Sequence, residues 1–230
     1  MCNQLKVEFF KFRHFILFYL GVILMAGAGG AYGFLKFPNA DIYDGFTATL
    51  SDVSFMFVTA LVSAWFVGND FSNRTIHNEI TTGYSRLSVL FVRELPAFLS
   101  AVITHFMYVV STMIGLGMKK GFSFEGFQIQ DLYWCIVVML QLIAMQSIIV
   151  FITFLCAKAA ASIAASVCVI FFMCNIARNF VETKVYTLSC FSLAGNHSCE
   201  TLISTGIVAI VTIVVVVSIT WLIFRKREVK

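Results

Sequence analysis

Long apolar runs constrain this sequence more than any other feature. Several windows of about 18 to 25 residues carry almost no charge, which is the length an α-helix needs to cross ~30 Å of hydrocarbon. Hydrophobic residues make up 60% of the 230 residues and charged residues only 12%. A soluble domain of this size cannot bury so much apolar surface in one core, and continuous runs disfavour a β-barrel. We therefore expect an all-α polytopic membrane protein.

The hydropathy pattern predicts six spans. They cover residues 15–34, 46–67, 87–117, 132–156, 159–176 and 202–224. Six spans place both termini on one side of the membrane, and that side holds most of the sixteen Lys and Arg residues. The positive-inside rule then puts both termini in the cytoplasm, with Lys119 and Lys120 as exceptions. The net charge of +4 records this bias and does not indicate nucleic-acid binding.

Residues 1–14 have the pattern of a short amphipathic helix. Leu5, Phe9 and Phe12 recur at helical spacing, with Lys6 and Lys11 among the intervening residues. Such a helix can lie in the membrane interface with its basic side toward anionic headgroups. The alternative is that these residues only flank the first span.

A polar segment at 68–86 separates the second and third apolar runs. Ser72 or Asn73 can cap the start of a short helix over 74–82. Its position predicts a compact cytoplasmic helix presented to a partner in the water.

The same segment contains signals for the end of that helix. Ile76 and Ile80 are one turn apart and predict a common buried face. Gly83 stands where a left-handed residue ends a helix, and Ser85 can cap the next helix.

Few polar residues fall within the spans. Asp52 can lie at headgroup level or line a polar path, and His105 is either a packed residue or a proton relay. Gly29 and Gly33 are four residues apart, which lets a second helix approach closely.

The seven cysteines show no metal-binding spacing. Cys190 and Cys199 share segment 177–201, which the six-span topology makes extracytoplasmic. They form either a disulfide or two free thiols.

Motifs for catalysis are absent from the sequence. It contains no GxxxxGK[ST] phosphate-binding loop, no HExxH zinc motif and no GxSxG elbow. We therefore expect no enzyme activity and no cofactor bound by this chain.

The polar segment resembles the coupling loop of type-2 ABC transporter permeases, the membrane subunits of ABCG-like exporters. The residues that carry the resemblance are Gly68-Asn69-Asp70-Phe71, Arg74-Thr75-Ile76, Asn78-Glu79, Gly83 and Ser85-Arg86. The nearest members in pattern are small bacterial permeases of lantibiotic self-protection, antimicrobial-peptide export or drug export. The resemblance implies one permease domain over 1–230, with 1–14 as connecting helix, 68–86 as coupling loop and 177–201 as external segment.

The resemblance also implies partners and roles. Two permease subunits, identical or different, would form the path, and two soluble ATPase subunits would bind ATP and Mg²⁺ and dock on the 74–82 helix. The substrate would be an amphipathic peptide or a lipophilic drug, exported across the bacterial cell membrane. The residues implied in ATPase coupling are Asp70, Phe71, Arg74, Thr75, His77, Asn78, Glu79, Gly83 and Arg86. The residues implied along the path are Ser51, Asp52 and Ser54.

Two other classes remain open. An ATP-independent secondary transporter would need more ionisable groups in its spans, and an inverted repeat with broken helices, neither of which is evident. A membrane scaffold that binds a soluble partner through the same loop is the other alternative.

Overall fold

The fold is built from helices of very different lengths. The computed structural model describes residues 2–36, 41–53, 55–123, 125–177, 179, 185–186, 189–193 and 199–226. Helix accounts for 87% of the structure, and no strand occurs among these residues. The elements are α1 (Cys2–Arg13), α2 (Ile16–Lys36), α3 (Ile42–Leu50), α4 (Met56–Ser72), α5 (Thr75–Thr81), α6 (Arg86–Lys120), α7 (Ile129–Cys156), α8 (Ala159–Phe171), the π-helix η1 (Phe172–Ala177) and α11 (Cys199–Lys226).

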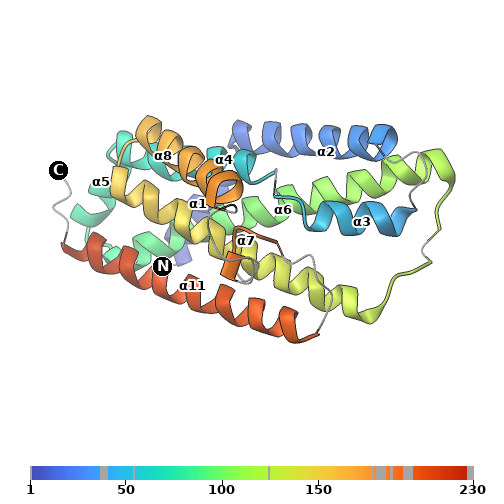
Figure 1. The fold of residues 1–230 in the computed structure, drawn as a ribbon. Helices are drawn as coiled ribbons and strands as arrows, with labels where there is room; N and C mark the ends of the chain where they lie inside the picture. Colours follow the sequence, from blue (N-terminus) through green and yellow to red (C-terminus); the bar gives the residue numbers. More distant parts are fainter. Residues whose placement is uncertain are drawn as a thin grey trace.

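Four helices are long and apolar enough to cross a membrane. They are Ile16–Leu35 within α2, α6, α7 and α11, and they correspond to the predicted spans 15–34, 87–117, 132–156 and 202–224. The axes of these helices are roughly aligned, and α6 and α7 are antiparallel, with α2 packed on α6 and α11 packed on α7 (Figure 1). α11 is the least buried of the four, since only 17% of its most apolar window is covered by the rest of the protein. This arrangement fits a membrane protein.

The predicted second span, 46–67, is not one continuous helix, so that prediction is wrong in this respect. α3 ends at Leu50 and α4 begins only at Met56. The hydroxyls of Thr49 and Ser51 donate hydrogen bonds to backbone carbonyls four residues earlier. Such side-chain hydrogen bonds weaken and bend helices. The Asp52 carboxylate then accepts a hydrogen bond of 2.8 Å from the Tyr108 hydroxyl, which holds the unwound residues against α6.

The predicted fifth span, 159–176, is a shorter α-helix with a different ending. α8 stops at Phe171, and the chain continues as the π-helix η1 to Ala177. The first backbone amide of α8, Ala159 N–H, donates to the Ser72 hydroxyl at the end of α4 (3.1 Å). A side chain of one helix thus caps the start of another.

Much of the segment 177–201 lies outside the described residues. The described part at 189–193 packs inward, with Cys190, Phe191 and Leu193 buried in the main hydrophobic cluster. The Gln141 amide in α7 donates to the carbonyls of Ser189 (3.2 Å) and Ser192 (3.0 Å). This stretch is therefore part of the core, as its apolar composition suggests.

The small-residue face of α2 does what its spacing predicts. At Gly29 and at Gly33, an added Cβ would collide with backbone carbonyl oxygens of α6. The Thr112 hydroxyl of α6 donates to the Gly29 carbonyl at 3.0 Å. The two helices are thus in backbone contact, as small residues permit in membrane bundles.

We expect Gly33→Ala to destabilise the protein by about 1–3 kcal/mol, because the new methyl group would overpack this contact. Gly27→Ala is the matched control, since a Cβ at Gly27 meets nothing within 4 Å. The control should be neutral or stabilising by roughly 0.5–1 kcal/mol, through better helix propensity. Thermal unfolding in detergent micelles measures both, and equal melting temperatures would contradict the close α2–α6 contact.

Candidate functional site

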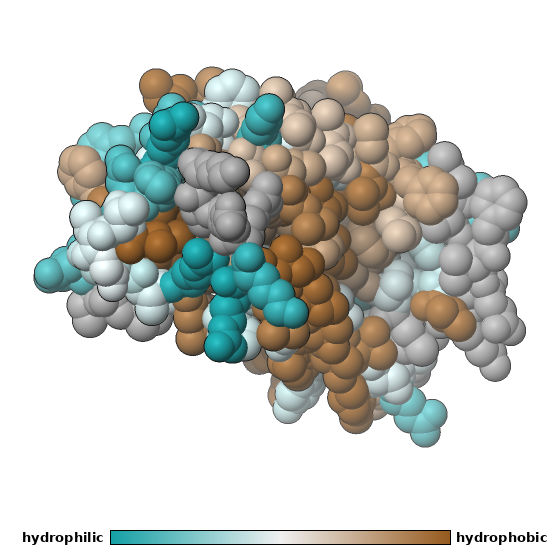
Figure 2. Space-filling view, turned by 90° about the vertical axis from the view of Figure 1, so that its left-hand side faces the viewer, coloured by the Kyte–Doolittle hydropathy of each residue, from teal (hydrophilic) through white to brown (hydrophobic). Residues whose placement is uncertain are grey.

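The candidate site is the end of the bundle where α5 lies, together with α1 and the last turns of α11 (Figure 1). Figure 2 looks onto this end and shows hydrophilic side chains in the foreground, beside apolar ones that continue along the helices. The predicted coupling loop, 68–86, falls here. Its first residues differ from the prediction, because α4 continues through Gly68 to Ser72 before the chain turns.

Left-handed residues stand at both ends of α5. Arg74 precedes the helix with φ 56°, so Arg74 rather than Ser72 or Asn73 is the N-cap. Gly83 follows the helix with φ 95°, as predicted, and Tyr84 N–H closes the turn by donating to the Glu79 carbonyl (3.1 Å). Ser85 caps α6 by accepting from Ser88 N–H, also as predicted.

One face of α5 is anchored in a hydrophobic cluster. Ile76 is fully buried, and Ile80 packs against the same cluster. Phe66 of α4 and Phe224 of α11 also belong to it. The i, i+4 spacing of the two isoleucines therefore predicted the buried face correctly.

α1 is oriented differently from the sequence-based expectation. Its polar residues Gln4 and Glu8 are buried, while Val7 and Phe10 are exposed. The Ser88 hydroxyl of α6 donates to the Gln4 side chain at 2.6 Å. The inward side of α1 thus combines the polar Gln4 and Glu8 with the buried Phe12, and its outward side combines Val7 and Phe10 with charged residues such as Lys6.

Five charged residues from four helices meet between α1, α4, α5 and α6. We call this group the ionic cluster; its members are Glu8, Lys11, Asp70, Glu79 and Arg93. Arg93 is at its centre and is fully buried. Its two terminal nitrogens donate to the two Glu79 oxygens at 3.0 and 2.9 Å, and its Nε lies 3.1 Å from Asp70 Oδ2.

Lys11 extends the ionic cluster to α1. Its ammonium group lies 2.6 Å from Glu8 and 3.4 Å from Asp70. Burial lowers the pKa of Lys11, but the charges of Asp70 and Glu8 outweigh burial and raise this pKa overall. Burial, and next the negative charge of Asp70, raise the pKa of Glu8. Three carboxyl groups, those of Glu8, Asp70 and Glu79, thus share two cations.

A further acid is buried beside the ionic cluster. Glu94 is 1% exposed, and neither carboxylate oxygen has a hydrogen-bond partner among the described residues.

The residues expected in ATPase coupling divide into inward and outward groups. The inward ones are Asp70 and Glu79 in the ionic cluster, Phe71 against Phe154, and Arg86. Arg86 donates to the carbonyls of Phe224 (2.5 Å) and Arg225 (3.0 Å) and so caps α11. Glu79 and Arg86 were expected on the exposed side, and the structure contradicts that placement.

Arg74, Asn78 and Gly83 are exposed, and Thr75 and His77 are half-buried. The exposed residues Arg74, Asn78 and Gly83 are the most accessible members of the set.

The candidate path residues lie elsewhere. Ser51 and Asp52 occupy the break between α3 and α4, and Ser54 lies outside the described residues. Cys190 is a buried thiol and Cys199 an exposed one in this structure, and a disulfide between them stays a prediction. Burial raises the pKa of Cys190 to about 12. Within the part of the chain that the structure describes, no group of His, Cys, Asp and Glu is arranged to hold a metal ion.

Sequence reasoning missed the roles of Lys11, Glu8 and Arg93. Lys11 was expected on the basic side of the helix over 1–14, facing the headgroups, and Arg93 received no role. The sequence signal was the pair Arg93-Glu94 within an apolar run. Charged residues buried in such a helix usually need partners, so this pair indicated that other charged residues pack against it.

Comparison with known proteins adds no assignment: no protein-family model, no curated protein and no solved structure matches this chain.

Replacing Arg93 by Met should destabilise the protein by about 3–5 kcal/mol, because Asp70 and Glu79 would lose their buried counter-charge. Arg13→Met is the control at an exposed position, with an expected change within about 0.5 kcal/mol. Thermal unfolding in detergent reports both variants. If they melt together, the ionic cluster does not hold this end of the bundle.

Glu8→Gln should change how stability depends on pH. Since the pKa of Glu8 is raised, the folded protein holds this proton more tightly than the unfolded chain. The protonated Glu8 therefore contributes to the free energy of unfolding. This contribution is complete below pH about 4.3, the pKa of Glu in an unfolded chain, and is lost as pH rises through the raised pKa of the folded state.

Glu8→Gln cannot titrate at this position, so its stability does not decrease for this reason as pH rises. Melting temperatures from pH 4 to 9 should therefore show the wild type losing ground relative to Glu8→Gln as pH increases. Parallel curves would mean that Glu8 titrates as it does in the unfolded chain.

Proposed function

We propose that this chain is the membrane-spanning permease subunit of an ATP-driven exporter, and that separate ATPase subunits dock on the 74–82 region. The observation that supports this most is the attachment of α5. Glu79 joins it to Arg93 of α6 through two hydrogen bonds, and Arg93 also pairs with Asp70 of α4. A helix of only seven residues is thereby fixed to two much longer ones.

This attachment suits the transmission of force. Isolated helices this short are unstable in water, so α5 depends on its anchors for its shape. The buried Ile76 and the paired Glu79 hold it on one side. A push on its outer face would therefore move the ends of α4 and α6 rather than bend a loop.

The outer face of α5 offers the docking surface. Its exposed residues are Arg74, Asn78, Thr81, Thr82, Gly83 and Tyr84. One cation, several hydrogen-bonding groups and one aromatic ring are a common composition for a protein contact. Charge reversal at Glu79 is a poor probe of this surface, because it would break the pair with Arg93.

The remaining features of the proposal follow the family resemblance. Six spans would place both termini, α1 and α5 in the cytoplasm, with α3–α4 as a broken second span and α8–η1 as the fifth. Two such subunits would form the path, and an amphipathic peptide or a lipophilic drug would be exported across a bacterial cell membrane. The exposed apolar face of α1, with Val7 and Phe10, supports its position at the membrane interface.

One observation favours a second candidate, a secondary transporter that works without ATP. Such proteins bind substrates and ions at interrupted spans, and the break between α3 and α4 places Asp52 against Tyr108. No inverted repeat accompanies this break in the sequence, so we rank it second.

Co-purification tests the proposal. The tagged chain is extracted in mild detergent from its native host after cross-linking through Asn78→Cys on the outer face of α5. We expect a soluble ATPase with a phosphate-binding loop, in stoichiometric amount. Tyr133→Cys is the control, since Tyr133 is exposed near the start of α7 and should not capture that ATPase. If no ATPase appears in either preparation, the coupling proposal fails and the second candidate takes its place.

Arg74→Glu should weaken the ATPase contact about tenfold or more, a loss of about 1.4 kcal/mol, and leave the melting temperature unchanged. Lys120→Glu makes the same charge change at an exposed position. Lys120 is the last residue of α6, at the end away from α5, so this variant should leave binding intact. Affinity for the purified ATPase measures both. Equal affinities would exclude Arg74 from the docking surface.

A further inference from the structure

The break between α3 and α4 faces a histidine that none of the contacts above explains. His105 lies in α6, three residues before Tyr108, and is 4% exposed. Its ring packs on Phe55 at the start of α4, with 4.2 Å between ring centroids. Neither ring nitrogen makes a hydrogen bond of good geometry among the described residues, although the Leu50 backbone lies close enough to interact with the ring.

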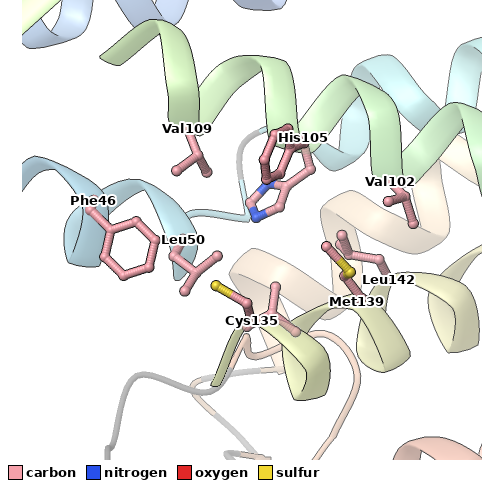
Figure 3. Close-up of a pocket in the computed structure, with 10 residues that line it drawn as sticks. Phe46, Leu50, Val102, His105, Val109, Cys135, Met139 and Leu142 are labelled. Carbon is pink, nitrogen blue, oxygen red and sulfur yellow. The ribbon is translucent and has the colours of Figure 1, made fainter. Parts of the chain in front are cut away.

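A small cavity adjoins this ring. It has a volume of about 30 Å³ and is bounded by α3, α6 and α7. Figure 3 shows the ring nitrogens pointing away from α6, toward Leu50 and Cys135. One water molecule needs roughly 10–15 Å³, so the cavity has room for one.

The walls cannot satisfy the ring by themselves. A neutral imidazole has one N–H donor and one acceptor nitrogen. The Leu50 backbone, in the last turn of α3, interacts with the ring, but as a carbonyl it could serve only the N–H. The other lining residues are apolar except Cys135, whose thiol is a weak donor. The acceptor nitrogen therefore lacks a strong donor.

We propose that this cavity is a binding site for one water molecule, which donates to a ring nitrogen of His105. Buried waters occur where otherwise unsatisfied polar groups border a space of this size. The carbonyl end of α3 supplies the water with a second partner, since the last carbonyls of a helix have no partner within it.

This water gives α3 a second polar link to α6. The first is the hydrogen bond between Asp52 and Tyr108; the second runs from a carbonyl in the last turn of α3 through the water to the acceptor nitrogen of His105, beside the direct approach of the Leu50 backbone to the ring. Both links hold the half-helix that precedes the break, and neither involves the ionic cluster. The site is thus independent of the docking proposed for α5.

Water-edited NMR on histidine-labelled and tryptophan-labelled protein in lipid nanodiscs tests the site. We expect rapid magnetisation transfer from water to the His105 ring, comparable to that of the exposed His14. The indole of Trp134, which is 1% exposed, serves as the dry reference. A His105 signal as slow as that of Trp134 would overturn the proposal.

Cys135→Leu is the decisive variant, because it fills the cavity with an apolar side chain and leaves His105 in place. It should abolish the transfer to His105, while Cys168→Leu, at an exposed position of α8, should not. If the His105 signal were unchanged in Cys135→Leu, the water would lie elsewhere and the assignment of this cavity would be wrong.

His105→Gln and His105→Phe separate a water-binding role from packing. Gln keeps groups that can bind the water, whereas Phe keeps the ring but not its nitrogens. We expect the melting temperature of the Gln variant to stay nearer to wild type. A Phe variant as stable as the wild type would show that no water is needed here.

Discussion

A buried guanidinium sets the structure of one end of this bundle. Arg93 has no access to solvent and is neutralised by carboxylates from α4 and α5. Removing an arginine from water is favourable only where its hydrogen bonds are well made. α4, α5 and α6 must therefore keep their relative positions if the charge is to stay buried. Lys11 brings α1 under the same constraint through Asp70.

The rest of the bundle depends on close packing. α2 approaches α6 at Gly29 and Gly33, where backbone meets backbone, while α11 keeps most of its branched side chains at the surface. In lipid, helix association relies on such contacts because apolar side chains gain little by leaving an apolar solvent. The two regions thus use different physical means: ion pairing at the end that carries α5, and small-residue packing along the spans.

The sequence predicted those features that depend on local chemistry. Hydropathy located the four long helices, and the residue preferences of helix ends located Gly83 and Ser85. Prediction from the sequence failed where contacts between residues far apart in the chain determine the local structure. The second apolar run is long enough to span, but hydroxyl groups and the bond from Tyr108 to Asp52 interrupt it. Likewise, α1 looked like a helix with basic residues outward, whereas Lys11 turns inward to Asp70, a residue more than fifty positions away, and pairs with the buried Glu8 beside it.

The two left-handed residues beside α5 have a consequence for its rotational setting. Arg74 and Gly83 have left-handed backbone conformations, which a right-handed α-helix does not contain. α4, α5 and α6 therefore cannot join into one continuous helix. Each helical residue adds about 100° of rotation, so the anchored residues Ile76 and Glu79 determine which residues of α5 point outward. Residues on the open side can therefore be replaced one at a time without changing the direction in which that side points, provided that the anchors and the two left-handed residues are kept.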